Sequence, residues 1–500
     1  MRASTLIVCL AVGFLLIAPN LTFASQNSAN RFSTGQAVRI GQVNVRSLPS
    51  IQSSLTGSGR LIPNFGLSVQ TSASLPVVSG SSTTSPISGV SVISNLDGVF
   101  GGAPNQCGCT PPDPNLGVGT RHVFETVNIA GIIYLKNGVP ARSTFSLADF
   151  FRVSVSSFIG DPEVMFDPSS GTSGRWFVSS IVAPNNVEFA VSTTDDATGT
   201  YVLYTVSGGS SFPDQPFIGT NDDKFVISVN AFTTKFLGAE FFVLNKAELV
   251  SGAPSVDFAT VGPDPTLFSA HPARHLTSST NFYLVSVAFG SATAATLLTV
   301  TGLPPGPVSV ARNSFAVNPI SNPPRATQPT TGTKLVTNDD RVLSAAWESN
   351  VLWFSLTDSC VPNGDAKIRS CARLIEITTS GTAAPTKVQD FDYAVANTFL
   401  FYPAVSLSQG KLVVVFGETS STIFPSLLVT GRDPTDPANT LQNVVTIRSG
   451  TANDESTRYG DYFGAATDPT GTSTFWVAGE YRVDEIFQNW STAIAQVQIA

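Results

Sequence analysis

Aspartates recur at similar places in a pattern that repeats along this 500-residue chain. Each stands beside a proline, a glycine or a charged residue, just before a short apolar run. A turn and a second, stronger apolar run then follow. In two further copies of the pattern, His271 and Tyr402 occupy the corresponding place. The aspartates are Asp113, Asp161, Asp214, Asp340 and Asp461.

Carboxylates that gather in this number repel one another, and their pKa values rise unless a cation or an arginine compensates. Arg341 and Arg458 lie close to two of the aspartates in sequence and are candidate counter-charges. Several hard oxygen ligands suit Ca²⁺. We therefore expect a polar ligand site, with Asp161, Asp214 and Asp461 as the candidate Ca²⁺ ligands. The residues of this site are Asp113, Asp161, Asp214, His271, Asp340, Arg341, Tyr402, Arg458 and Asp461.

Other roles for these acids stay open at this point. An aspartate before proline or at a strand entry commonly caps a turn through local backbone hydrogen bonds. Paired carboxylates also carry out glycoside hydrolysis, in which their separation sets the stereochemical outcome. Serine-histidine-aspartate catalysis is disfavoured, because none of the three histidines follows a nucleophile-elbow sequence. The sequence assigns no catalytic residue.

The repeat itself predicts how these residues are brought together. Successive openings lie 48 residues apart at Asp113 and Asp161, and up to 69 apart at His271 and Asp340. Units of about 50 residues with about four strands each are typical of a β-propeller. We expect an all-β, seven-bladed propeller with mostly four-stranded antiparallel blades, or six blades if the first unit is incomplete. A pair of β-sandwiches is the competing fold.

The chain divides into three parts on composition. Residues 1–24 read as a secretory signal, with Arg2 followed by an apolar segment and small residues before a cleavage point. Residues 25–104 are rich in Ser, Gly and Thr, and residues 105–500 carry the repeat. The last unit shows only three strand-like runs, so we expect part of the 25–104 segment to supply the missing strand and latch the ring.

The composition limits the partners. Charged residues make up only 12% of the chain and the formal net charge is −8. We expect no nucleic-acid partner, because phosphate binding needs a basic patch and none is visible in the sequence. After signal cleavage no segment is expected to stay inserted in a membrane. These features predict a secreted, extracellular or periplasmic protein.

Four cysteines follow the signal segment. Cys360 and Cys371 flank a polar loop between two strand-like runs, and we expect them to form a disulfide. Cys107 and Cys109 are separated by one glycine, and they are open to several interpretations: a strained pair, free thiols, or half of a metal site. The five tryptophans are expected to pack between blades rather than to form carbohydrate platforms.

Two segments resemble the Asp boxes of the sialidase-like propeller superfamily. They are the turns at 167–171 and 468–471, which precede Trp176 and Trp476. Residues 111–119, 161–176, 340–345 and 458–476 further resemble a group of secreted microbial propeller proteins of unknown function. The resemblance covers residues 105 to 500 and implies the fold and export. It implies little about activity, since propellers host both enzymes and binding modules.

These observations favour an extracellular binding or scaffold module with an acidic axial site, for a glycan or protein ligand. One alternative is a sialidase-like or other glycan-acting hydrolase. Another is a structural component of a cell surface.

Overall fold

The computed structural model describes residues 32–51, 60–61, 79–80, 89–100, 109–154, 157–456, 458–483 and 490–500. Within these ranges most residues form β-strands. The helices described are short: η1 (Val45–Ser47), α1 (Leu147–Phe151) and α2 (Lys246–Ser251). None of the described helices is long and apolar enough to cross a membrane. The expected all-β fold is confirmed, whereas the signal segment lies outside the described residues.

Antiparallel four-stranded groups follow one another along the chain, and each is named here by its first strand. The first three groups are β6 (Asn115–Val118), β7 (His122–Val127), β8 (Ala130–Leu135) and β9 (Pro140–Ser146); β10 (Ile159–Asp167), β11 (Arg175–Val182), β12 (Asn186–Ser192) and β13 (Thr200–Ser207); and β14 (Phe212–Thr220), β15 (Lys224–Phe232), β16 (Phe236–Asn245) and β17 (Ser255–Asp264). The next two are β18 (Phe268–Pro272), β20 (Phe282–Val287), β21 (Ser291–Gly302) and β22 (Val308–Ser321); and β23 (Val342–Glu348), β24 (Val351–Pro362), β25 (Arg369–Thr378) and β26 (Thr386–Tyr393). The last two are β27 (Thr398–Ser408), β28 (Lys411–Ser420), β29 (Ser426–Arg432) and β30 (Val445–Arg448); and β31 (Gly464–Thr467), β32 (Thr474–Arg482), β33 (Trp490–Ile499) and β4 (Val90–Phe100).

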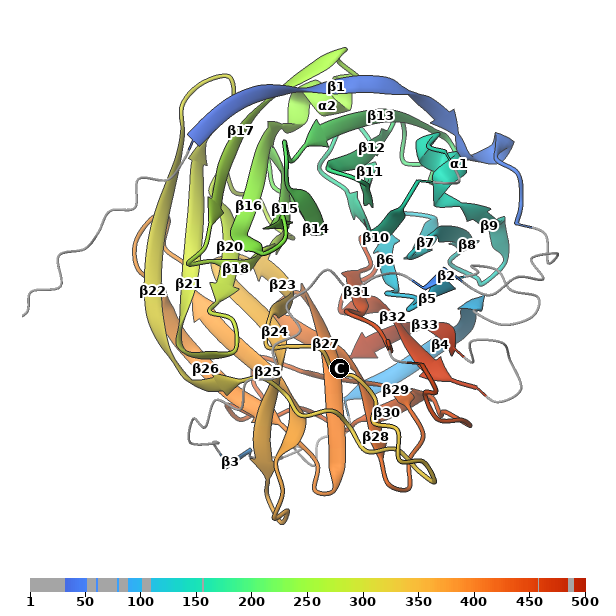
Figure 1. Ribbon diagram of the computed structural model, residues 1–500, viewed down its shortest axis with the longest axis vertical. Helices are drawn as coiled ribbons and strands as arrows, with labels where there is room; N and C mark the ends of the chain where they lie inside the picture. Colours follow the sequence, from blue (N-terminus) through green and yellow to red (C-terminus); the bar gives the residue numbers. More distant parts are fainter. Residues whose placement is uncertain are drawn as a thin grey trace, which may run out of the picture.

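The groups are arranged in a closed ring around a common axis (Figure 1). The first strand of each group contacts the first strand of the next, and β31 contacts β6. Hydrophobic clusters lie between each sheet and its neighbour; Trp476 and Ala478 of β32, for example, cluster with Val123 of β7. Because each sheet buries both faces against other sheets, the core is distributed around the ring. This is a propeller-like architecture.

Strands from the N-terminal side complete the ring. β4 pairs with β33, from Val90 opposite Ile499 to Phe100 opposite Ser491, and gives the β31 group its fourth strand. β1 (Phe32–Asn44) pairs with the outer strands β13 and β17, and so joins two groups into one nine-stranded sheet. Three two-residue strands add parallel pairs: β2 (Arg60–Leu61) with β5 (Cys109–Thr110), β3 (Ser79–Gly80) with β24, and β19 (Arg274–His275) with β23.

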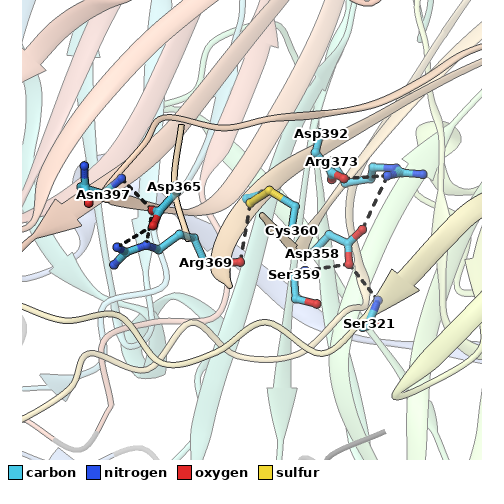
Figure 2. The surroundings of a disulfide bond; sticks show 10 residues. Ser321, Asp358, Ser359, Cys360, Asp365, Arg369, Arg373, Asp392 and Asn397 are labelled. Carbon is cyan, nitrogen blue, oxygen red and sulfur yellow. Dashed lines mark hydrogen bonds and ion pairs between the residues drawn. A yellow bond between two sulfur atoms is a disulfide. The ribbon is translucent and has the colours of Figure 1, made fainter. Parts of the chain in front are cut away.

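All five tryptophans are buried, at 3% exposure or less, so their expected role in packing is confirmed. The predicted disulfide is also confirmed: Cys360 of β24 is bonded to Cys371 of β25 (Figure 2). Cys109 is disulfide-bonded as well, and Cys107 lies outside the described residues.

A buried arginine lies close to the Cys360–Cys371 disulfide (Figure 2). Arg373 of β25 forms ion pairs with Asp390 at 2.5 Å, Asp392 at 2.9 Å and Asp358 at 3.7 Å. Asp358 also accepts hydrogen bonds from the backbone N–H groups of Ser321 and Ser359. Because Ser321 belongs to β22, this cluster ties the β18 group to the β23 group.

Candidate functional site

The backbone takes the same unusual turn where several first strands begin. Asp113 and Asp161 both have φ of 47° and are each followed by proline. Gln215, at φ 49°, and Tyr402, at φ 55°, repeat this arrangement. Aspartate adopts the left-handed region more readily than most residues. The ladder of β10 also shifts between Gly160 and Glu163, and such a bulge re-aims the side chain.

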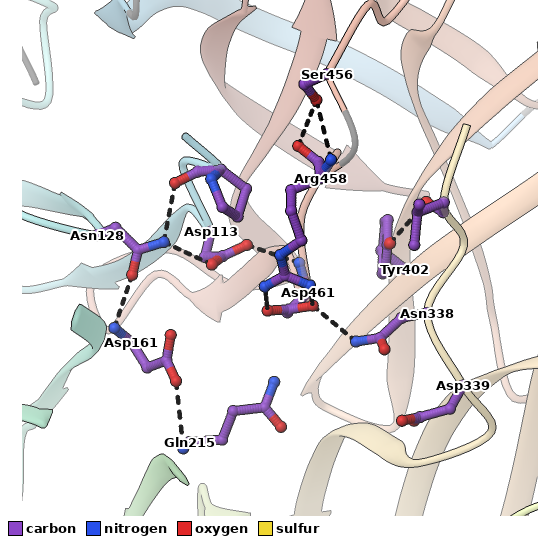
Figure 3. Close-up of polar contacts among 12 residues, drawn as sticks. Asp113, Asn128, Asp161, Gln215, Asn338, Asp339, Tyr402, Ser456, Arg458 and Asp461 are labelled. Carbon is purple, nitrogen blue, oxygen red and sulfur yellow. Dashed lines mark hydrogen bonds and ion pairs between the residues drawn. The ribbon is translucent and has the colours of Figure 1, made fainter. Parts of the chain in front are cut away.

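This geometry brings three predicted site residues together at the mouth of the ring (Figure 3). One carboxylate oxygen from each of Asp113, Asp161 and Asp461 lies within 4.8 Å of the others, and all three residues are buried. Asp113 and Asp461 are joined directly, because the Asp461 backbone N–H donates to Asp113 Oδ1 at 2.6 Å. Acids that are up to 348 residues apart in the chain are therefore neighbours. We call these three residues the acidic cluster.

Asn128, in the turn after β7, links two members of the cluster (Figure 3). Its side-chain Nδ2 donates to Asp113 Oδ2 at 2.6 Å, and its Oδ1 accepts from the Asp161 backbone N–H at 2.7 Å. Asp161 Oδ2 in turn accepts from the backbone N–H of Gln215 at 3.3 Å. The hydrogen bonds run from one first strand to the next and hold the carboxylates in place.

Two arginines lie at this mouth, as the sequence suggested. Arg458 donates to both carboxylate oxygens of Asp461, at 3.1 and 2.5 Å, and Asn338 Nδ2 donates to Asp461 at 2.8 Å. Arg341 binds Asp339 in the same bidentate way, at 2.7 and 2.6 Å, and also donates to the Gln215 side chain. Arg341 is therefore engaged outside the acidic cluster, and Arg458 is the cation bound to it.

Burial raises the pKa values of three aspartates in this region. Burial, reinforced by repulsion from Asp461, raises the pKa of Asp113 to about 8. Burial, together with repulsion from Asp214, raises the pKa of Asp161 well above its usual value. The pKa of Asp214 is raised to about 6, because burial outweighs the attraction of Arg341. Ionising all these groups at once requires more positive charge than Arg458 provides.

The other predicted site residues are placed differently. His271 packs its ring against Phe217 with 4.3 Å between ring centroids, and burial lowers its pKa to about 3, so it is a neutral packing residue. Asp340 points to the β20–β21 turn, where Oδ1 accepts from the Gly290 backbone N–H at 3.0 Å. The Tyr402 hydroxyl donates to the Val336 carbonyl at 2.9 Å, and Tyr402 is fully buried.

Four residues that line this mouth did not stand out in the sequence: Asn128, Gln215, Asn338 and Asp339. Asp339 is the acid that Arg341 binds, whereas Asp340 was the acid selected from the sequence. Gln215, rather than Asp214, has the left-handed conformation shared with Asp161. The proline that follows both Asp161 and Gln215 is the signal that would have aligned them correctly.

Below the acidic cluster, a second polar layer crosses the axis. Asn115 Nδ2 donates to Glu163 Oε1 at 3.0 Å, and Arg274 lies 3.6 Å from Glu163 Oε2. Burial raises the pKa of Glu163 to about 7 in spite of Arg274. The Arg274 guanidinium also reaches the carbonyls of Leu116 and Ala465, both at 3.4 Å. This layer separates the acidic cluster from the opposite end of the ring.

The acidic cluster can hold a metal ion. It offers carboxylate oxygens from three separate first-strand regions, and hard cations such as Ca²⁺ and Mg²⁺ bind oxygen ligands. A divalent cation would also neutralise the acids whose pKa values burial raises. Soft metals are not favoured, since no thiol or imidazole belongs to the cluster.

No protein-family model matches the sequence, and no curated protein matches it. Among solved structures, the chain is similar to an α-L-arabinofuranosidase from Fusarium graminearum at 11% identity, covering 81% of this chain and 98% of that one, with a TM-score of 0.40. It is also similar to the extracellular domains of Drosophila Semaphorin 1a at 8% identity, covering 78% and 87%, with a TM-score of 0.37. TM-scores this low say nothing about the site. The fold and the site of this chain follow from its own strand pairing and contacts.

Proposed function

We propose that this chain is a secreted, seven-bladed β-propeller that acts as an extracellular binding module, with a Ca²⁺ ion at its acidic cluster. The observation that carries the proposal is the meeting of Asp113, Asp161 and Asp461, which are buried within 4.8 Å with one bound arginine. A cation held there would join the β6, β10 and β31 groups and present a fixed charge at the mouth of the axis. A glycan or a protein loop with carboxylate or hydroxyl groups would be the ligand.

Two features support seven blades and export. Each of the four-stranded groups begins with a strand at the axis, and a separate hydrophobic cluster lies at each junction between neighbouring groups, including that between the β31 and β6 groups. The signal-like segment at 1–24 and the Cys360–Cys371 disulfide suit an exported protein. The resemblance to secreted propeller proteins agrees with a propeller fold and with export.

Calorimetric titration of the chelator-treated protein with Ca²⁺ tests the metal. We expect saturable binding with a dissociation constant between about 10⁻⁶ and 10⁻³ M, and a rise in melting temperature. Asp161→Asn should weaken binding by at least about tenfold, because it removes one charged ligand. Asp264→Asn is the matched control, since Asp264 also precedes a proline but pairs with Arg312 away from the cluster. The metal proposal fails if 10 mM Ca²⁺, roughly tenfold above the top of that range, gives neither heat nor a thermal shift.

A glycan-acting hydrolase is the second candidate, and one observation favours it. Burial keeps a proton on Asp113 up to a pH of about 8, and a protonated carboxyl beside a second carboxylate is the arrangement that glycosidases use. Asp113 is fully buried, however, so a substrate would have to reach Asp161 or Asp461, which are 7% and 6% exposed. Turnover of any member of a chromogenic glycoside panel, lost in Asp161→Asn, would favour the enzyme. Binding on a glycan array without turnover would favour the module.

A further inference from the structure

A cavity lies on the axis of the ring, at the opposite end from the acidic cluster. Its volume is about 300 Å³, and the ends of several first strands line it. The lining includes Gly117 of β6, Met165 of β10, Thr220 of β14, Ser406 of β27 and Ala466 of β31. It therefore has contributions from most of the way around the ring, as does the acidic cluster.

The two sites are separate. Asp161 stands near the beginning of β10 and Met165 four residues later, which is about 13 Å along an extended strand. Between them lies the layer formed by Asn115, Glu163 and Arg274. Arg274 also lines the cavity, so this residue belongs both to the polar layer and to the cavity wall. A ligand in this cavity would not touch the acidic cluster.

The contacts that the Arg274 guanidinium makes within the chain are all long. Its contacts are Leu116 O and Ala465 O at 3.4 Å, Asn115 Oδ1 at 3.3 Å and Val164 O at 3.5 Å, with Glu163 at 3.6 Å. All of these exceed the usual 2.7–3.2 Å of a good N–H to O hydrogen bond. A ligand oxygen at normal distance would therefore gain a stronger interaction than any that Arg274 has now.

The other charged groups of the cavity have close partners. Asp167 pairs with Lys246 at 2.8 Å, and Asp468 pairs with Lys136 at 2.6 Å. Glu348 accepts from the backbone N–H groups of Gln409 and Gly410, at 2.9 and 2.6 Å. Arg274 is thus the charged lining group whose contacts are all long. The rest of the polar lining is mainly hydroxyl groups, from Thr220, Ser406, Ser408, Thr467 and Thr472.

We propose that this cavity binds a small polyhydroxy monocarboxylate, with its carboxylate on Arg274 and its hydroxyl groups on the serines and threonines. Guanidinium and carboxylate make the strongest hydrogen-bonded pair available to side chains. The volume is at the lower end of the range for ligand sites, which limits the ligand to a small molecule.

Titration with gluconate, and with sorbitol as the matched neutral compound, tests the proposal. The two molecules differ only in the carboxylate, so gluconate should bind at least about tenfold more tightly, as expected for loss of one charged hydrogen-bonded pair. The titrations are done in a chelator, so that gluconate cannot act through a cation at the acidic cluster. Failure here therefore leaves the Ca²⁺ proposal standing. Absence of gluconate binding, or equal binding of sorbitol, would overturn the assignment.

Two variants then locate the site. Arg274→Lys keeps the positive charge beside Glu163 but loses the planar fork, and should weaken gluconate binding about tenfold. Thr472→Trp places a bulky side chain at the exposed rim, away from the packed core, and should block entry. Arg312→Lys is the control, because Arg312 lies elsewhere, on β22. Gluconate binding that survives both Arg274→Lys and Thr472→Trp unchanged would place the ligand outside this cavity.

Discussion

The aspartates that precede proline fall into two physical classes. Asp113 and Asp161 lie at the axis beside Asp461, which binds Arg458, and both have raised pKa values. Asp167 and Asp468 lie in hairpin turns, and each pairs with a lysine of the neighbouring group. Burial alone would raise the pKa of Asp167, but Lys246 and the hydroxyls of Ser169 and Ser170 outweigh it and lower the pKa. The same dipeptide thus produces opposite electrostatics.

The difference arises from backbone conformation and from what the side chain meets. In the turns, Asp468 accepts from the Thr470 backbone N–H at 2.8 Å and from Trp476 Nε1 at 3.0 Å, as a turn-capping aspartate does. At the axis, the left-handed residue directs its carboxylate away from its own strand, toward other carboxylates. Turn aspartates stabilise the fold as they are, whereas axial aspartates are stabilised when a proton or a cation is added.

The largest effect on the free energy of unfolding should come from removing Arg458, the arginine bound to the acidic cluster. Arg458→Met leaves Asp461 buried without its bidentate partner, and breaking a buried ion pair costs about 3–5 kcal/mol of the free energy of unfolding. Urea denaturation in a chelator measures this loss. Added Ca²⁺ should recover part of it by replacing the missing charge.

Arg448→Met is the control for that experiment. Arg448 pairs with Asp97 at 3.0 Å, but the two side chains are 27% and 57% exposed. An exposed pair contributes less than about 1 kcal/mol. If Arg458→Met and Arg448→Met cost the same, the arginine at the axis does not neutralise a buried acidic cluster.

The next effect concerns pH. The folded-state pKa of Asp113 is raised to about 8 from an ordinary 3.8, so its protonation stabilises the fold fully below pH 4 and is lost as pH rises to about 8. In a chelator, the wild type should lose on the order of 2–4 kcal/mol over this interval. Asp113→Asn should flatten the decline. Unfolding free energies measured between pH 4 and pH 8 give the slope, which is independent of any fixed cost of the substitution.

Asp167→Asn should change the pH dependence of stability differently from Asp113→Asn. The pKa of Asp167 is lowered, so its contribution is present above pH 4 and disappears only as pH falls below its usual value. This variant should keep the wild-type slope between pH 4 and pH 8 and lose stability by a constant amount there. Equal slopes in Asp113→Asn and Asp167→Asn would remove the distinction between axial and turn aspartates.

Much of the architecture could be predicted from the sequence because the repeat is strong. Turn residues such as 468–471 and aromatic runs such as 475–478 specify hairpins locally, and restarts about 50–70 residues apart indicate sheets in a ring. The missing strand of the last group was expected from the N-terminal side, and β4 pairs there. The partner of β1 could not be predicted, because pairing with both β13 and β17 depends on how two finished sheets meet.

The site was harder to predict at the level of single residues. Asp113, Asp161 and Asp461 were selected from the repeat, and the structure places them together. Asp214 was also selected, and its charge acts on Asp161, but the carboxylates that lie within 4.8 Å of one another are those of Asp113, Asp161 and Asp461. Asn128 follows an ordinary apolar strand, and only the ring geometry brings it between two carboxylates. Residue type finds the acids, whereas register decides which of them meet.

A smaller effect is expected at the second turn aspartate. Asp468→Asn removes the negative charge opposite Lys136, which is 19% exposed and can turn to solvent. The asparagine oxygen can still accept from the Thr470 backbone N–H. The loss should be about 2 kcal/mol, typical of a hydrogen bond to a charged group, and thermal denaturation at neutral pH measures it. A loss as large as that in Arg458→Met would mean that a turn aspartate contributes as much to the free energy of unfolding as the Arg458–Asp461 ion pair.

The smallest effect is expected at Asp433, which has the same turn chemistry with more solvent around it. Asp433 accepts from the Thr435 backbone N–H at 2.9 Å and lies 3.3 Å from Lys411, with both charged side chains 21% exposed. Because water screens this pair and an asparagine can retain the turn hydrogen bond, Asp433→Asn should change the free energy of unfolding by less than about 1 kcal/mol. The series Asp468→Asn and Asp433→Asn then relates the cost of one substitution in one type of turn to burial and to the Trp476 hydrogen bond that Asp468 accepts. Should Asp433→Asn cost more than Asp468→Asn, the lysine contacts would not be what separates turn aspartates from axial ones.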